Sequence, residues 1–288
     1  MKSFQYLHFG TCSWKYDSWR GIIYPAEGKF NYLEEYSKHF DTVEIDQWFW
    51  SLFNEKIKLP MKKDVIDYVQ SVPENFKFTI KVPNSITLTH QYRKNKKAEL
   101  IPNKFFLSVD LFDEFLNSIS ELLPKVGMLM LQFEYLNKQK RSSQIEFLSK
   151  LKPFLQKVKV DLPIGIELRN PNYLNEFYFE FLNEIRVYNV FLQGYYMPPI
   201  WDIYKKYKDY IKDKVVIRLH GPNREDIEEK SGGNWNKIIS PKDDELQHII
   251  EILKDLEKRK IETYINVNNH YEGSAPLTIE KIKSMLIA

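Results

Sequence analysis

The sequence contains a single cysteine, and it has no long apolar run and no linker rich in glycine or serine. Cys12 has no second thiol to pair with, so the secreted classes that depend on disulfides are excluded. No run reaches the length of a membrane span, and the first residues lack the apolar stretch of a signal peptide. These absences predict a soluble cytoplasmic protein with no membrane partner.

A large excess of one charge is also missing. The 42 Lys and Arg residues face 39 Asp and Glu residues, which gives a formal net charge of +3. This value is too small to indicate a general nucleic-acid surface. The one local exception is the basic run RKNKK at 93–97, which we interpret as a solvated loop that could touch a phosphate backbone. Nucleic acid is therefore an alternative partner and not the favoured one.

Short apolar runs alternate with amphipathic segments along the whole chain. The predicted strands are 7–12, 42–46, 76–81, 127–133, 163–169, 187–194, 214–221 and 262–269. The predicted helices are 31–39, 62–71, 106–123, 143–157, 174–185, 201–211, 240–260 and 276–287. Eight strands alternating with helices predict one α/β domain over residues 1–288, a single (β/α)8 TIM barrel with an excursion at about 82–105.

Two local features refine this prediction. Ser240, followed by Pro241 and acidic residues, is typical of a helix N-cap and first turn. No G-x-G-x-x-G follows the first predicted strand, which argues against a doubly wound dinucleotide-binding sheet.

Polar residues gather at the C-terminal ends of the predicted strands. Alternate residues of a strand share a face, so the inward-facing polar positions can be read from the sequence. They are Glu44, Asp46, Lys81, Gln132, Glu167, Arg169, Arg218, His220 and Asn266. Because barrel enzymes carry their sites at this end, we expect one site here. The polar positions collect at one end only, which favours a site over a structural network of ion pairs.

The residue types suggest acid–base chemistry on an anion. Lys81, Arg169 and Arg218 can hold a phosphate or carboxylate. Arginines beside Glu44 and Glu167 keep these carboxylates ionised, which suits a base or nucleophile and leaves His220 as the proton donor. A hydrolase or lyase acting on a small polar, phosphate- or sugar-containing ligand is the leading hypothesis. A structural role, in which the acids neutralise the bases, remains the alternative.

A metal site is a further possibility. Glu44, Asp46, Glu167 and His220 could supply ligands to a divalent metal. The three neighbouring cations would repel such an ion, so no cofactor and no metal ligand is predicted, and a divalent metal stays an alternative. Cys12 is expected to pack within its strand.

Seven motifs follow one another in a recognisable order. They lie at 10–25 (GTCSWKYDSWRGIIYP), 42–50 (TVEIDQWFW), 78–90 (FTIKVPNSITLTH), 127–133 (GMLMLQF), 164–173 (IGIELRNPNY), 217–221 (IRLHG) and 264–276 (YINVNNHYEGSAP). In this order the chain resembles the domain of unknown function 72 family. The resemblance implies a barrel of the xylose-isomerase and endonuclease IV type and no assigned activity.

The resemblance also implies functional positions. These are Trp14, Tyr16, Trp19, Glu44, Lys81, His90, Gln132, Glu167, Arg169, Arg218, His220, Asn268 and Asn269. The sequence departs from the family pattern at Asp46, Trp50, Asn170 and Tyr173. A metal-dependent phosphodiesterase or DNA-binding protein similar to endonuclease IV, and a non-catalytic scaffold, are the alternatives that this fold family adds.

Together these observations predict a catalytic set of Glu44, Glu167 and His220. The predicted substrate-binding residues are Trp14, Asp46, Lys81, His90, Gln132, Arg169, Arg218, Asn266, Asn268 and Asn269. We expect Arg218 and His220 to face a water-filled cavity, so that replacing either changes stability by roughly 1 kcal/mol or less.

Overall fold

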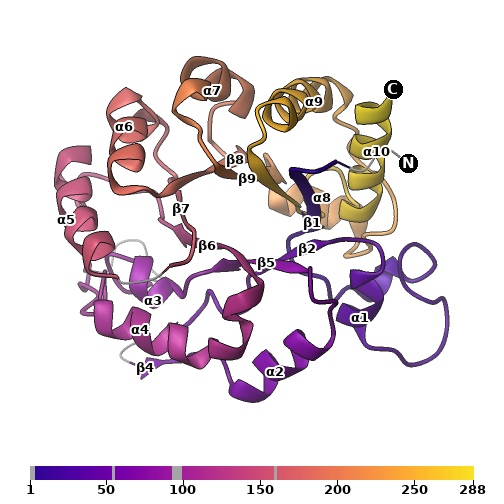
Figure 1. The fold of residues 1–288 in the computed structure, drawn as a ribbon, viewed down its shortest axis with the longest axis horizontal. Helices are drawn as coiled ribbons and strands as arrows, with labels where there is room; N and C mark the ends of the chain where they lie inside the picture. Colours follow the sequence, from indigo (N-terminus) through magenta and orange to yellow (C-terminus); the bar gives the residue numbers. More distant parts are fainter. Residues whose placement is uncertain (1–3, 54–55, 93–98, 159–160) are drawn as a thin grey trace.

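The computed structural model describes residues 4–53, 56–92, 99–158 and 161–288. Within these residues, eight parallel strands form a nearly closed barrel surrounded by helices (Figure 1). In order around the barrel the strands are β1 (Leu7–Thr11), β10 (Glu262–Val267), β9 (Lys214–Gly221), β8 (Tyr188–Gly194), β7 (Ile164–Glu167), β6 (Val126–Gln132), β5 (Lys77–Lys81) and β2 (Thr42–Ile45). The predicted (β/α)8 barrel is confirmed.

Helices alternate with these strands along the chain. They are α1 (Tyr32–Ser37), α2 (Lys62–Gln70), α3 (Asn84–Thr87), α4 (Val109–Ser118), α5 (Gln144–Lys157), α6 (Glu176–Ile185), α7 (Ile200–Tyr207), α8 (Arg224–Ser231), α9 (Asp243–Lys258) and α10 (Ala275–Ile287). Short 3-10 turns lie at Asp17–Trp19, Ser120–Lys125, Pro171–Tyr173 and Lys208–Tyr210. None of the helices in the described part of the chain combines the length and the hydropathy that a bilayer crossing needs.

Three helix predictions need correction. The segment 106–123 is not one helix, because α4 ends at Ser118 and a 3-10 turn containing Pro124 follows. The loop after β9 holds α8, which the sequence analysis missed. Ser240 is not an N-cap, since α9 begins two residues after Pro241 with Lys242 at the cap position.

A buried glutamate explains the shifted start of α9. The backbone N–H of Lys242 donates to Glu272 Oε1 at 2.8 Å, and that of Ser240 donates to the Glu272 backbone oxygen at 3.0 Å. Glu272 is fully buried in the loop after β10. This contact between distant segments satisfies the backbone groups that a local serine cap would otherwise serve.

The lower half of the barrel interior is an apolar layer of its own. Met128, Met130, Val190, Val216 and Tyr264 form a buried cluster separate from the main core. Gly127 makes room for the Tyr264 ring, because a Cβ at Gly127 would lie 2.6 Å from the ring carbon Cζ. The inward side chains of the barrel strands therefore close this end of the interior and leave the polar residues above it.

The barrel closes between β1 and β2 with little backbone pairing. Within the described residues these strands meet in one bridge, between Cys12 and Glu44. The buried Tyr36 hydroxyl, from α1, replaces the missing ladder. It accepts from the Thr11 N–H at 2.8 Å and donates to the Thr42 oxygen at 3.0 Å. An outer helix thus supplies the hydrogen bonds that join the first two strands.

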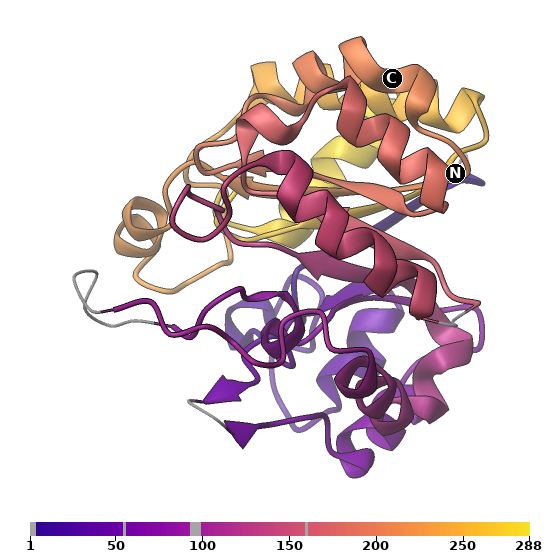
Figure 2. The same cartoon turned by 90° about the vertical axis from the view of Figure 1, so that its left-hand side faces the viewer.

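The predicted excursion follows β5 and begins with α3. The side-chain amide of Asn103 ties it together by donating to the backbone oxygens of Ser85 and Leu88, both at 2.7 Å. Figure 2 shows this segment, α8 and the short hairpin of β3 (Leu52–Phe53) and β4 (Lys56–Ile57) projecting to the same side of the molecule. The basic run at 93–97 lies outside the described residues.

Candidate functional site

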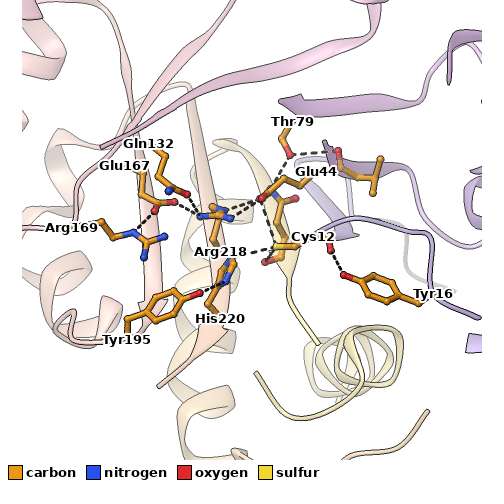
Figure 3. Close-up of polar contacts among 12 residues, drawn as sticks. Cys12, Tyr16, Glu44, Thr79, Gln132, Glu167, Arg169, Tyr195, Arg218 and His220 are labelled. Atoms are coloured by element: carbon orange, nitrogen blue, oxygen red, sulfur yellow. Dashed lines mark hydrogen bonds and ion pairs between the residues drawn. The ribbon is translucent and has the colours of Figure 1, made fainter. Parts of the chain in front are cut away.

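Arg218 occupies the centre of the polar end of the barrel. It lies on β9, and its side chain reaches between β2 and β7 (Figure 3). Nε and Nη2 donate to the two carboxylate oxygens of Glu44, each at 2.7 Å. Nη1 donates to Glu167 Oε2 in a short hydrogen bond. One guanidinium therefore joins three strands on different sides of the barrel.

This ionic triad is closed to solvent. The side chains of Arg218, Glu44 and Glu167 expose 2%, 0% and 1% of their surface. The expectation that Arg218 faces a water-filled cavity is therefore wrong. Burial alone would raise the pKa of Glu167, but Arg218, Arg169 and Lys81 outweigh burial and hold it at about 2. Both Arg218 and Glu167 are charged at neutral pH.

Neutral polar groups complete the shell around the triad. Asn266 Nδ2 donates to Glu44 Oε2 at 3.2 Å and to Thr79 Oγ1 at 2.8 Å. Gln132 Oε1 lies 3.4 Å from Arg218 Nη1. The structure thus brings together the predicted residues of five strands. They touch one another directly, which is the arrangement expected of a structural network.

An ion pair at the opposite end of the barrel supports the same interpretation. Lys214, at the start of β9, pairs with Glu262 at the start of β10, and the Tyr264 hydroxyl donates to the same carboxylate. The expectation that charged positions collect at one end only is therefore wrong. Ion pairs help to organise both ends of the barrel. The candidate functional groups are therefore the polar side chains at the carboxyl end that keep atoms free of such pairs.

Arg169 is the first of these groups. It follows β7, and its Nε donates to Glu167 Oε1 at 2.7 Å. Its guanidinium carbon lies 4.7 Å from the centre of the Tyr195 ring, and 22% of the side chain is exposed. Among the described residues, no acid contacts Nη1 or Nη2, so the outer edge of this guanidinium can receive an anion.

His220 lies beside Arg169 at the end of β9. Its Nδ1 is 3.3 Å from the Tyr195 hydroxyl and its Nε2 is 3.5 Å from Cys12 Sγ. Burial lowers the pKa of His220 well below 6.5, and the positive charges of Arg218, Arg169 and Lys81 lower it further. His220 is neutral at pH 7, so it suits the role of proton acceptor better than the donor role that the sequence suggested.

Lys81 ends β5 and also points into this end of the barrel. Only 9% of the residue is exposed, and its Nζ lies 3.8 Å from the centre of the Phe49 ring. Burial lowers the pKa of Lys81, and Arg218 lowers it further. Asp46, which follows β2, is affected in the opposite direction. Burial raises the pKa of Asp46, and the nearby Glu44 adds to the effect.

A metal site can be tested on the donor atoms. Among the described residues, Cys12, Glu44 and His220 have ligand atoms within 4.8 Å of one another. However, Arg218 and Asn266 already donate to both Glu44 oxygens. Burial raises the pKa of the Cys12 thiol well above its usual value, and Glu44 adds to this effect. A metal ion would need a thiolate and would face the Arg218 charge, so this set does not fit a cation.

Four predicted residues lie outside this group of contacts. Trp14 packs edge-on against Tyr68 at 5.0 Å and lines a separate cleft with it. His90 is half-buried in the excursion, with Nδ1 2.9 Å from Thr89 Oγ1. Asn268 and Asn269 hydrogen-bond within their own loop, accepting from the N–H groups of His270 and Ala275.

Sequence reasoning missed three residues that line the site. Cys12 follows β1 and contacts both Glu44 and His220. Tyr195 follows β8 and lies one residue beyond the end of the predicted strand at Gly194. Phe49 comes after β2 and covers the Lys81 amine. Tyr195 was detectable in principle, because it comes directly after a strand on the same barrel end as the polar set.

The fold and these contacts define the class of protein. The chain is a (β/α)8 barrel that carries a buried ionic triad, with a histidine, a lysine and a second arginine around it, at the carboxyl ends of its strands. It belongs to the family described as protein of unknown function DUF72, whose model matches residues 8–288. The resemblance found in the sequence is confirmed.

Relatives in two bacteria agree with this assignment. The chain is 25% identical over 283 residues to the UPF0759 protein YunF of Bacillus subtilis, which covers 93% of this chain and 90% of that protein. It is 24% identical over 167 residues to the UPF0759 protein YecE of Escherichia coli K12, covering 58% of this chain and 50% of that protein.

Solved structures show the same fold. A DUF72 family protein from Enterococcus faecalis V583 matches with a TM-score of 0.69 and 20% identity, over 98% of this chain and 96% of the other. A DUF72 family protein from Thermotoga maritima MSB8 matches with a TM-score of 0.67 and 20% identity, over 98% and 99%. At this identity the likeness concerns the fold.

Proposed function

We propose that the chain is an enzyme that acts on a small anionic ligand, carrying a phosphate or carboxylate, at the carboxyl end of the barrel. One observation carries the proposal. Arg218 is saturated by two carboxylates, whereas Arg169 keeps an edge without an acidic partner among the described residues. A rigid, partly exposed guanidinium fixed by Glu167 and Tyr195 is suited to hold an anion by two parallel hydrogen bonds.

The contacts around Arg169 suggest a separate role for each residue of the site. Glu167 orients Arg169 through Nε and stays ionised, so it acts as a positioning residue. His220, neutral and in contact with Tyr195, is placed to accept a proton from a ligand held by Arg169. Glu44 fixes Arg218 and thereby the electric field at the base of the site. The chemistry proposed is acid–base catalysis of the hydrolase or lyase type without a metal.

Ligand binding tests this proposal. Phosphate and acetate, titrated at constant ionic strength, are expected to raise the melting temperature of the wild-type protein, because binding to the native state stabilises it. The Arg169→Gln variant should lose this response while keeping its fold. Arg186→Gln is the matched control, since Arg186 is an exposed arginine at the end of α6, before β8. An equal response in the wild type and Arg169→Gln would contradict the proposal.

A further inference from the structure

The amine of Lys81 is buried without an acidic partner. Lys81 is aligned with Met130 of β6, on the inner face of the barrel. Its contact is the face of the Phe49 ring, which is itself 6% exposed and covers the amine. Within the described part of the chain, no carboxylate oxygen lies within 4.0 Å of Nζ. Other buried cations of the site, such as Arg218, have such partners.

Charged groups from several elements surround this amine. They are Glu44 of β2, Asp46 after β2, Glu167 of β7 and Arg218 of β9. The two glutamates are already paired with Arg218. The positive charge of Arg218 therefore offsets their negative charge at the position of the Lys81 amine. Asp46 is the remaining acid, and burial raises its pKa, with Glu44 adding to the effect.

This environment makes Lys81 easier to deprotonate than a solvated lysine. The Phe49 ring face attracts the ammonium ion, but moving that ion out of water without an acidic partner is costly, and the nearby Arg218 adds repulsion. Both effects lower the pKa of Lys81, burial being the larger. A neutral primary amine has a lone pair and is a nucleophile, whereas the ammonium ion is not.

We propose that Lys81 is a covalent nucleophile that forms an imine with the carbonyl group of an anionic ligand held by Arg169. This inference rests on the proposed function and narrows the ligand to a carbonyl compound that bears a carboxylate or phosphate. In this proposal the ligand carbon lies between the amine of Lys81, at the end of β5, and the guanidinium of Arg169, which follows β7.

The reaction is balanced without a further reagent. The nitrogen lone pair attacks the carbonyl carbon, the C–N bond forms, and the C=O π pair moves to oxygen. One proton passes from nitrogen to that oxygen and gives a carbinolamine. The hydroxyl group then leaves as water with the second N–H proton, and the C=N bond forms. We assign the relay of these protons to His220, a neutral imidazole that shares its neighbour Tyr195 with Arg169.

Reductive trapping tests the inference. The wild-type protein is incubated with glyoxylate and borohydride, and the lysine adducts are located by peptide mass spectrometry. We expect Lys81 to be labelled at a lower pH than Lys77, a partly exposed lysine of the same strand whose Nζ donates to the Pro124 oxygen. Labelling should be lost from that position in Lys81→Arg. Labelling of surface lysines with none at Lys81 would overturn the inference, and this result needs no variant.

The result can be separated from the proposed function. If Lys81 stays unlabelled while phosphate still stabilises the protein through Arg169, the imine proposal fails and the proposed function survives. If neither labelling nor stabilisation occurs, both fail. In Arg169→Gln, glyoxylate labelling of Lys81 should fall several-fold, whereas labelling by the uncharged acetaldehyde should be unchanged. A parallel fall with both aldehydes would remove Arg169 from the anion-binding role.

Discussion

Arg218 donates two hydrogen bonds of 2.7 Å each to Glu44, which lies 174 residues away in the sequence and on a strand that is not its neighbour. The same guanidinium binds Glu167, so three buried charges depend on one another. Replacing such a triad by apolar groups can be harmless, but removing one member leaves an unpaired buried charge.

Removal of Arg218 is therefore expected to destabilise the protein. Arg218→Met should lower the free energy of unfolding by ~3–5 kcal/mol, because Glu44 then remains buried without a cationic partner and Glu167 keeps only Arg169. Adding Glu44→Gln and Glu167→Gln should recover much of this loss. Urea unfolding measures both, with Arg224→Met as the control, since Arg224 forms an exposed pair with Glu228. A loss below ~1 kcal/mol for Arg218→Met would support the solvated site that the sequence suggested.

Acid should destabilise the protein through His220. The unfolded chain binds a proton at His220 below about pH 6.5, whereas the folded chain keeps this side chain neutral because its pKa is well below 6.5. The unfolded state then holds more protons, so stability falls as the pH is lowered from 7 to 5, by at most ~1.4 kcal/mol per pH unit.

The His220→Gln variant checks this assignment. Its urea midpoint should change less between pH 7 and pH 5 than that of the wild type. Glu167 does not affect the comparison. Its stabilising contribution is lost only as the pH falls from 4.5, the ordinary pKa of the group, towards its folded-state pKa of about 2. Identical pH dependence in the two proteins would show that His220 has the same pKa in the folded and unfolded states, against this prediction.

Metal content separates the triad from the metal-site alternative. The purified protein should contain no stoichiometric zinc or manganese, and Co²⁺ should produce no thiolate charge-transfer band. The reason is that Arg218 occupies both oxygens of Glu44. In Arg218→Met combined with Glu167→Gln, the donors Cys12, Glu44 and His220 lose this competitor and should gain affinity for Co²⁺. A cobalt band in the wild type would contradict the triad as described.

The apolar end of the barrel offers a packing test. Gly127→Ala should cost ~1–3 kcal/mol, because its Cβ would lie 2.6 Å from the Tyr264 ring. Tyr264→Leu removes that ring and should make the alanine nearly neutral. A double-mutant cycle from urea unfolding measures this coupling. Additive losses would show that the interior can relax around the extra methyl group.

The sequence was sufficient to predict the fold and the inner faces of the strands. Strand alternation placed Glu44, Glu167, Arg218 and His220 on one side correctly, because a period of two is a local property. The reach of Arg218 across the barrel could not be predicted in this way. Whether a charged side chain meets water or another strand depends on the closed barrel, which no local pattern describes.

Helix ends show the same limit. Ser240 has the chemistry of an N-cap, yet Glu272, far along the chain, binds the backbone there and α9 starts later. Cys12 and Phe49 likewise became site residues through their neighbours in space. Their own types, a lone thiol and one aromatic among many, carried no functional signal in the sequence.

The junction of β1 and β2, which the Tyr36 hydroxyl bridges, is the part of the barrel that we expect to open locally most readily. Elsewhere neighbouring strands are joined by ladders of backbone pairs, but β1 and β2 share one backbone bridge, and side chains such as Tyr36 and Asp41 supply the other hydrogen bonds at their junction. Local opening is cheapest where the fewest hydrogen bonds are broken. The residues at this junction, Cys12 and Glu44, border the ionic triad. We therefore expect the β1–β2 junction to open locally before the other strand pairs, at a place next to the buried charges.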